Sequence, residues 1–262
     1  VEGDGRAPAL ALARELISEG RLGAIRHVRA AYLQDWLVDP ESPMTWRLNK
    51  DTAGSGALGD IASHAIDQVL FLLGDQVTEV SGRLHTFTSH RAGRNGLEEV
   101  TVDDAAWATL SLASGALASV EVSRMATGQK NSLKLEIYGE KGSILFDLED
   151  LNELGFLDAT VPVREQGFRR ILVNEPIHPY AAAWWPQGHV IGWEHTFTHE
   201  IRDFLVAIGS GSQPSPSFED GLTVQRILAA VEESAADKSA IIQLASNPAA
   251  AAPAPTACPE GA

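Results

Sequence analysis

The chain has 262 residues, of which 44% are hydrophobic and 21% are charged, a composition that suits a globular protein with a sizeable core. Its formal net charge of −15, with no cluster of Lys and Arg, argues against nucleic acid as a partner. No apolar run reaches membrane-spanning length and no basic-then-apolar leader opens the sequence, so we expect a cytoplasmic location and no membrane partner.

The first half of the chain predicts a helix, a strand and a second helix. The first helix starts near Pro8 and ends before Gly20. A strand rich in β-forming residues follows over 24–36, and a loop then leads to a central helix that Gly74 closes.

The second half begins with a run of strands joined by short turns such as Ser114-Gly115, which indicates antiparallel pairing. These strands are expected at 77–88, 102–113, 116–125, 132–138, 143–147 and 168–173. A loop rich in Trp and Pro follows at 174–192, and two helices are expected at 193–208 and 218–234.

This order of elements predicts an α+β fold, a two-layer sandwich with a large, mainly antiparallel sheet covered by helices on one face. We assign residues 1–246 to this domain and 247–262 to a disordered, Ala/Pro-rich tail. The uncovered sheet face leads us to expect a homo-oligomer that pairs through it.

The stretch from Gly54 to Gly74 carries the clearest chemistry. Asp60, His64 and Asp67 stand at i, i+4 and i+7, so a regular α-helix would place all three on one stripe. An imidazole that titrates near neutral pH, with a carboxylate one turn away, can serve as an acid–base pair. The alternative is a surface pair without chemistry, and for Asp67 we favour a structural role.

Three glycines in this stretch, Gly54, Gly56 and Gly59, match the G-x-G-x-x-G spacing of dinucleotide-binding loops. That motif requires a buried strand directly before the first glycine, whereas the residues at 46–53 are too polar for one. We therefore reject a Rossmann-type interpretation of these glycines.

Other candidates lie outside the central helix. Trp36, Trp46 and Arg47 could be packing residues or could face a sugar, because aromatic rings beside polar donors suit both uses. His195 and His199 have the spacing of two metal ligands on one helical turn, but two ligands do not make a site, and we expect no metal.

Several motifs together make the chain resemble the C-terminal domain of the glucose-fructose oxidoreductase, inositol dehydrogenase and MocA (Gfo/Idh/MocA) family. They are Arg6-x-Pro8-Ala9, Leu16-Ile17-x-x-Gly20-x-Leu22-Gly23, Trp46-Arg47, the central stretch from Gly54 to Asp67, and Phe218-x-Asp220-Gly221. Two further segments, 34–36 and 184–189, look most like members of the levoglucosan dehydrogenase type.

The resemblance implies hydride transfer between a sugar, glycoside or cyclitol and NAD or NADP. His64 matches the family's acid–base residue and Asp60 the aspartate that pairs with it. The residues expected to bind substrate are Gln34, Asp35, Trp36, Trp46, Arg47 and His189. Arg47 is also a candidate for contacting the cofactor.

Family members carry a nucleotide-binding domain and a catalytic lysine before this region, and neither is found in the given sequence, which begins at Val1. We interpret the chain as a fragment, a product of processing or a gene read from a non-Met start. Two functions stay open. One is the substrate domain of a dehydrogenase, inactive without a nucleotide-binding domain, and the other is a non-enzymatic module for sugar binding or oligomerisation.

Overall fold

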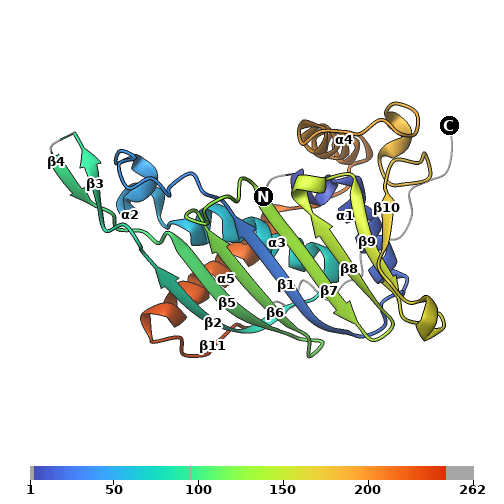
Figure 1. Ribbon diagram of the computed structural model, residues 1–262, viewed down its shortest axis with the longest axis horizontal. Helices are drawn as coiled ribbons and strands as arrows, with labels where there is room; N and C mark the ends of the chain where they lie inside the picture. Colours follow the sequence, from blue (N-terminus) through green and yellow to red (C-terminus); the bar gives the residue numbers. More distant parts are fainter. Residues whose placement is uncertain (1–2, 95, 246–262) are drawn as a thin grey trace.

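The computed structural model describes residues 3–94 and 96–245, and the tail predicted for 247–262 lies outside them. Within the described residues, nine strands form one sheet in the order β10-β9-β8-β7-β1-β6-β5-β2-β11 (Figure 1). Their bounds are Ile25–Leu33 (β1), Val77–His85 (β2), Ala105–Leu112 (β5), Leu117–Ser123 (β6), Ser132–Gly139 (β7), Gly142–Asp147 (β8), Glu153–Asp158 (β9), Arg169–Leu172 (β10) and Ile242–Gln243 (β11). A separate ribbon pairs β3 (His90–Gly93) with β4 (Gly96–Glu99).

The helices gather on one side of the sheet. The α-helices are α1 (Pro8–Ser18), α2 (Lys50–Ala53), α3 (Ser63–Leu73), α4 (Glu194–Ser210) and α5 (Phe218–Ala236). Short 3-10 turns occur at Gly3–Arg6 (η1), Trp46–Leu48 (η2), Leu148–Asp150 (η4), Val163–Glu165 (η5) and Ala181–Ala183 (η6), and Leu58–Ala62 (η3) is a π-helix. The predicted α+β architecture is confirmed. The ribbon β3–β4 and strand β9 were not predicted.

Every pairing in the large sheet is antiparallel except that of β1 with β6, within the described part of the chain. The two parallel strands lie at the centre, with Val28 opposite Ala118 and Leu33 opposite Ser123. Because parallel strands end at the same edge of a sheet, the residues after β1 and after β6 are brought together.

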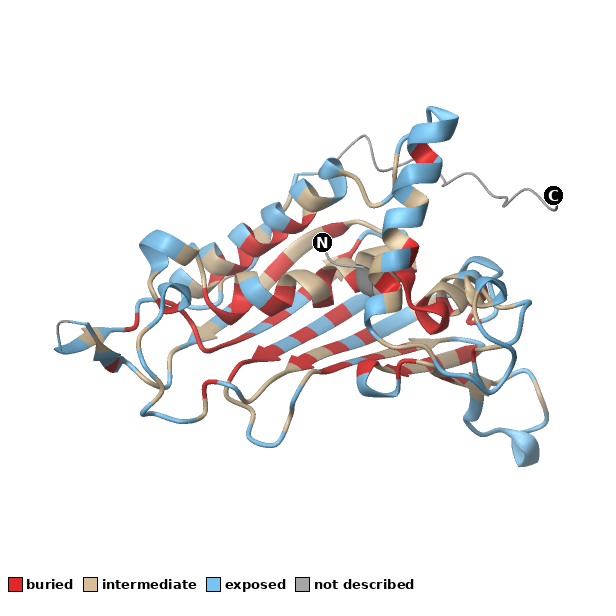
Figure 2. Ribbon diagram, turned by 90° about the horizontal axis from the view of Figure 1, so that it is seen from above, coloured by how far each residue is buried: buried red, intermediate tan, exposed pale blue. Residues whose placement is uncertain are grey.

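The core lies between the sheet and the helices, as Figure 2 shows by the buried residues on the facing sides of both layers. On β1 and β6 alternate residues point into this layer, so that Val28 and Ala30 are buried beside Val120 and Val122. Helix α3 contributes Ala65, Ile66, Val69 and Leu72, which recur at the helical period. Alternation in the strands and the helical period in α3 thus meet in one apolar layer.

The start of the central helix is held by a buried carboxylate. Asp103, in the turn before β5, accepts hydrogen bonds of 2.8 Å from the backbone N–H groups of both Gly56 and Leu58. The N–H of Ala57 donates to the Asp103 carbonyl at 3.1 Å. These bonds satisfy donors that a helix N-terminus otherwise leaves unpaired. The sequence predicted a strand from Val102, whereas residues 102–104 form this turn.

A regular helix was expected through Asp60 and His64, but Leu58–Ala62 is π-helical. A π-turn is wider than an α-turn, so Asp60 does not keep the position relative to His64 that a uniform α-helix would give it. The predicted C-terminus is confirmed, since Gly74 takes the left-handed conformation with φ of 59°.

Helix α4 stands apart from the main helical layer, and most of it is exposed (Figure 2). Its exposed large apolar residues, called the α4 stripe below, are Ile201, Phe204, Leu205, Val206 and Ile208. None of the helices that the structure describes is long and apolar enough to cross a membrane.

The backbone contact at Gly56 leaves no room for a side chain, because an added Cβ would lie 1.8 Å from the Asp103 carbonyl oxygen. We expect Gly56→Ala to lower the free energy of unfolding by about 3 kcal/mol, since the helix start must shift away from Asp103. Urea unfolding measures this change. Gly221→Ala, in open space within α5, is the matched control and should raise stability by up to about 1 kcal/mol.

Candidate functional site

Several of the predicted site residues lie at one edge of the large sheet. At this edge β1 and β6 end and β5 and β7 begin, as the pairs Leu33–Ser123, Leu33–Ser132 and Ala105–Ser123 show. The turn at Asp103 brings the start of the central helix to the same edge. The segments that carry His64, Trp36 and Arg124 therefore lie next to one another.

His64 lies in the first turn of α3 and is partly exposed. Its ring meets the Tyr32 ring edge-on, with 5.8 Å between the ring centroids. The Tyr32 hydroxyl donates to Oδ1 of Asn131, the residue just before β7, at 2.7 Å, which fixes the tyrosine ring. This packing gives the imidazole a defined wall while leaving part of it open to a ligand.

A chain of side-chain hydrogen bonds continues from Tyr32 along the end of β1. Gln34 Nε2 donates to the same Asn131 oxygen at 3.0 Å, and Trp36 Nε1 donates to Gln34 Oε1 at 2.9 Å. The Trp36 side chain is 43% exposed. The structure thus connects Gln34, Trp36 and His64 through two residues that the prediction missed, Tyr32 and Asn131.

Asp60 finds its charged partner on the sheet. Its carboxylate Oδ2 lies 3.6 Å from Nη1 of Arg124, which directly follows β6. Burial lowers the pKa of the Arg124 guanidinium, while the carboxylates of Asp60, Asp103 and Asp104 oppose this shift. A direct contact between Asp60 and His64 stays a prediction. Arg124 was missed because its buried position depends on the pairing of β6 with β1.

Asp35, Trp46 and Arg47 lie in the segments around this edge. Asp35 pairs with Lys130 at 2.6 Å and accepts the Gly128 N–H, and the hydrogen bond from Lys130 lowers its pKa. Trp46 is exposed, and the Arg47 guanidinium lies over its ring at 4.6 Å. The Thr101 N–H donates to the Leu48 carbonyl at 3.1 Å, which fastens this exposed pair to the loop before β5.

A cavity of 260 Å³ lies beside the start of the central helix. Its lining includes Lys50, Ser55, His85, Thr101 and Asp103. Neither His64 nor Asp60 belongs to this lining.

The model of the GFO/IDH/MocA C-terminal domain matches residues 10–145, which include the central helix, β1 and β6. The chain belongs to this family. The levoglucosan dehydrogenase of Pseudarthrobacter phenanthrenivorans is 41% identical over 248 residues, a match that covers 89% of this chain and 63% of that protein. The inositol 2-dehydrogenase of Rhizobium meliloti is 25% identical over 235 residues, covering 89% of this chain and 61% of the relative.

Solved structures agree in fold with this family domain. An oxidoreductase domain protein from Kribbella flavida shares 52% identity with a TM-score of 0.90, covering 93% of this chain and 64% of that one. Levoglucosan dehydrogenase in complex with NADH and levoglucosan shares 41% identity with a TM-score of 0.88, covering 93% and 64%. The chain therefore spans less than two thirds of the length of these relatives.

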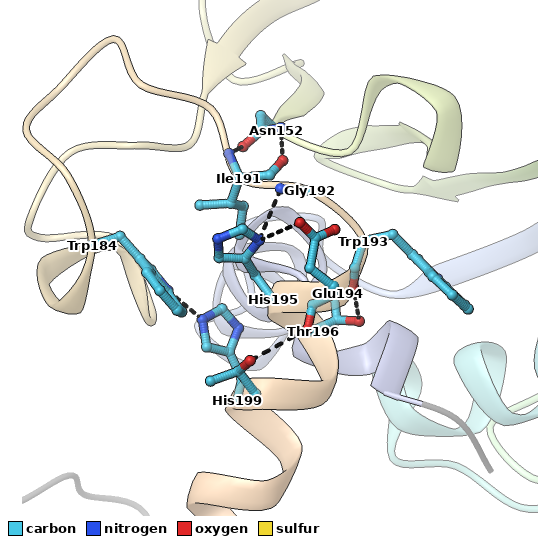
Figure 3. A network of polar contacts seen from close by, with 10 residues as sticks. Asn152, Trp184, Ile191, Gly192, Trp193, Glu194, His195, Thr196 and His199 are labelled. Carbon is cyan, nitrogen blue, oxygen red and sulfur yellow. Dashed lines mark hydrogen bonds and ion pairs between the residues drawn. The ribbon is translucent and has the colours of Figure 1, made fainter.

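The family domain carries a second polar group, around the start of α4 (Figure 3). Asn152, just before β9, fastens the loop after β10 through hydrogen bonds of 2.9 Å to the N–H and C=O of Ile191. His189 lies in this loop, exposed, with Nδ1 2.8 Å from the Pro186 carbonyl oxygen. Its predicted contact with substrate stays a prediction.

His199, on the inward side of α4, uses both of its ring nitrogens. Nδ1 lies 2.9 Å from the Arg6 carbonyl oxygen, which can only accept, and Nε2 lies 2.6 Å from the Trp184 indole N–H, which can only donate (Figure 3). The ring is therefore neutral, with its proton on Nδ1. In this arrangement neither nitrogen of His199 has a lone pair free for a metal.

Burial lowers the pKa of His199, so the folded state resists protonation that the unfolded chain accepts. The stability contributed by this neutral ring is complete above the unfolded pKa of about 6.5 and is lost as the pH falls toward the lower folded pKa. We expect the free energy of unfolding to fall below about pH 6.5, by at most about 1.4 kcal/mol per pH unit from this group.

Urea unfolding at several pH values measures this dependence. His199→Gln, whose amide can donate and accept, should flatten the curve, while His189→Gln should leave it unchanged because His189 is exposed. An unaltered slope in His199→Gln would show that other groups cause the acid sensitivity.

Proposed function

We propose that this chain is the substrate-binding and catalytic part of an NAD(P)-dependent dehydrogenase that oxidises a secondary alcohol of a sugar, glycoside or cyclitol. The observation that carries the proposal is the partly exposed His64 at the sheet edge, with the Tyr32 ring against it, while Asp60 and Trp36 both lie beside Arg124 at the same edge. The names of the relatives agree with it, because they include a levoglucosan dehydrogenase and an inositol 2-dehydrogenase.

In this proposal His64 is the acid–base residue. Oxidation of an alcohol removes a hydride from carbon and a proton from oxygen, and a neutral imidazole can accept that proton near neutral pH. Asp60, one helical turn earlier, stabilises the imidazolium that forms. The Asp60 side chain is 42% exposed, so the carboxylate is accessible from solvent.

The substrate would lie against the Trp36 ring, because the C–H faces of a sugar pack on aromatic surfaces while its hydroxyls seek fixed polar partners. Gln34 lies two residues away and is hydrogen-bonded to the Trp36 indole. Asp35, Trp46, Arg47 and His189 complete the proposed set of substrate contacts, from the segments around the same edge and from the loop before α4.

The glycine-rich stretch at 54–59 does not have the form of a dinucleotide-binding loop. The glycines at 54–59 follow α2 rather than a strand, and Gly56 is packed on the Asp103 backbone. The described sheet has no β-α-β unit that ends in such a loop. We propose that NAD or NADP is held mainly by a nucleotide-binding domain outside the residues described, with Arg47 as a possible contact from this chain.

A chimera tests this function. We expect the isolated chain to show no micromolar binding of NAD or NADP by isothermal titration calorimetry. In the chimera, this chain is joined to the part of the 41%-identical levoglucosan dehydrogenase that the match does not cover. The chimera should oxidise anhydro sugars or cyclitols, and absorbance measures the reduction of the nicotinamide. A folded chimera that binds NADH but oxidises no member of a sugar and cyclitol panel would favour the non-enzymatic module.

His64→Ala in the chimera should lower kcat by roughly 100-fold or more and leave NADH affinity unchanged, because it removes proton transfer alone. His189→Ala is the matched control, since this exposed histidine should change KM more than kcat. An unaltered kcat in His64→Ala would assign the acid–base role to another residue.

We further propose that the open face of the sheet forms a homo-oligomer. Most of this face is polar, with ion pairs such as Arg29–Glu136 at 2.8 Å and Lys134–Asp147 at 2.9 Å, but Trp107 and Leu117 are exposed on it. A mainly polar surface with a few large apolar residues is typical of interfaces between protein subunits.

Light scattering of the chain should give a multiple of the mass of one chain. Replacing Trp107 and Leu117 by Lys should yield a monomer, because two charges would enter the paired face. The control replaces Phe204 and Leu205 of the α4 stripe by Lys. If only the α4 control gave a monomer, the interface would lie on α4 and not on the sheet.

A further inference from the structure

Arg124 is a charged residue whose side chain is almost fully buried. Its side chain is 1% exposed, directly after β6 and beneath the sheet edge that carries the proposed site. Burying a guanidinium costs several kcal/mol unless partners replace the lost water. Its contacts therefore identify which groups the fold holds around this cation.

Three segments supply these partners. Nη2 donates to the Asp103 carbonyl oxygen at 2.8 Å, and Nη1 lies 3.6 Å from the Asp60 carboxylate. The guanidinium carbon lies 5.5 Å from the centre of the Trp36 ring. The turn before β5, the π-helical turn before α3 and the segment after β1 thus converge on one planar group.

The backbone does not need this guanidinium to hold the helix start. Gly56, Ala57 and Leu58 are already bonded to Asp103, and the Leu37 N–H donates to the Arg124 carbonyl at 3.1 Å. What the guanidinium adds is a fixed orientation of two side chains, Asp60 and Trp36. A planar group with five N–H donors does this better than a flexible ammonium.

We propose that Arg124 is a positioning residue that sets the Asp60 carboxylate and the Trp36 ring relative to each other, so that one buried cation aligns the acid–base pair with the aromatic wall for the sugar. The proposal rests on the function proposed above. A residue with a merely structural role would tie β6 to the helix start and leave both side chains free to turn.

The chain itself allows a first test. The indole N–H signals of its six tryptophans can be resolved by NMR, and Trp36→Phe identifies the signal of Trp36. We expect Arg124→Lys to displace this signal while the signals of the remaining tryptophans stay in place. Arg29→Lys, at an exposed arginine paired with Glu136 on the same sheet, is the matched control and should displace none.

Asp60→Asn provides a second variant in case Arg124→Lys does not fold. This substitution removes the negative charge that Arg124 Nη1 faces, and the Asp60 side chain is exposed enough to tolerate the change. The guanidinium should then shift, and the Trp36 signal should shift with it. The proposal is overturned if the Trp36 signal does not move in Arg124→Lys or in Asp60→Asn, whichever of them folds.

Kinetics of the chimera supply the decisive readout. Arg124→Lys and Asp60→Asn should each lower kcat about tenfold or more, because misplaced catalytic groups slow the reaction. The double variant should lose less than the product of the two single losses, since Arg124 acts in part through Asp60. Independent, multiplying losses would refute the proposal. An inactive parent chimera would count against the proposed function only, because the NMR test still decides the role of Arg124.

Discussion

The hold of Asp103 on the start of the central helix is the contact on which the site depends. The carboxylate is buried, which raises its pKa, and the N–H groups of Leu58 and Gly56 oppose that rise by stabilising the charged form. These bonds fix where the chain turns from loop to helix. Because His64 comes less than two turns after Leu58, any movement at this clamp would move the imidazole too.

The second constraint is the parallel pair at the centre of an otherwise antiparallel sheet. Since β1 and β6 run in the same direction, the residues that follow each strand emerge at one edge. Trp36 and Arg124 meet there although they are far apart in sequence, and the cation lies over the aromatic ring. A fully antiparallel meander would have sent the two side chains to opposite edges.

Local patterns in the sequence predicted much of this fold. Hairpin turns indicated antiparallel strands, and the glycine at 74 marked the end of the central helix, because these features depend on neighbouring residues. The family resemblance pointed to His64, Asp60, Gln34 and Trp36. Patterns of this kind contain no information on which distant segments pair.

For that reason Arg124 and Asp103 escaped prediction, although each is as central to the site as His64. Arg124 follows an ordinary strand, and nothing in its neighbours shows that pairing with β1 will bury it. Asp103 precedes an apolar strand with another acid, Asp104, and this pair of carboxylates at a strand start was the one local signal of a cap. The π-turn at Leu58–Ala62 was likewise not predicted from the sequence.

The α4 stripe has a practical consequence for work on the isolated chain. Its five large apolar side chains lie on the outside of a helix whose inner side is already occupied by Arg6, Trp184 and Tyr180. Environment-sensitive dyes bind exposed apolar surface, so this stripe can bind them in the native state. Dye-based melting curves of this chain should therefore start from a high fluorescence baseline, and circular dichroism is the more suitable probe of its unfolding.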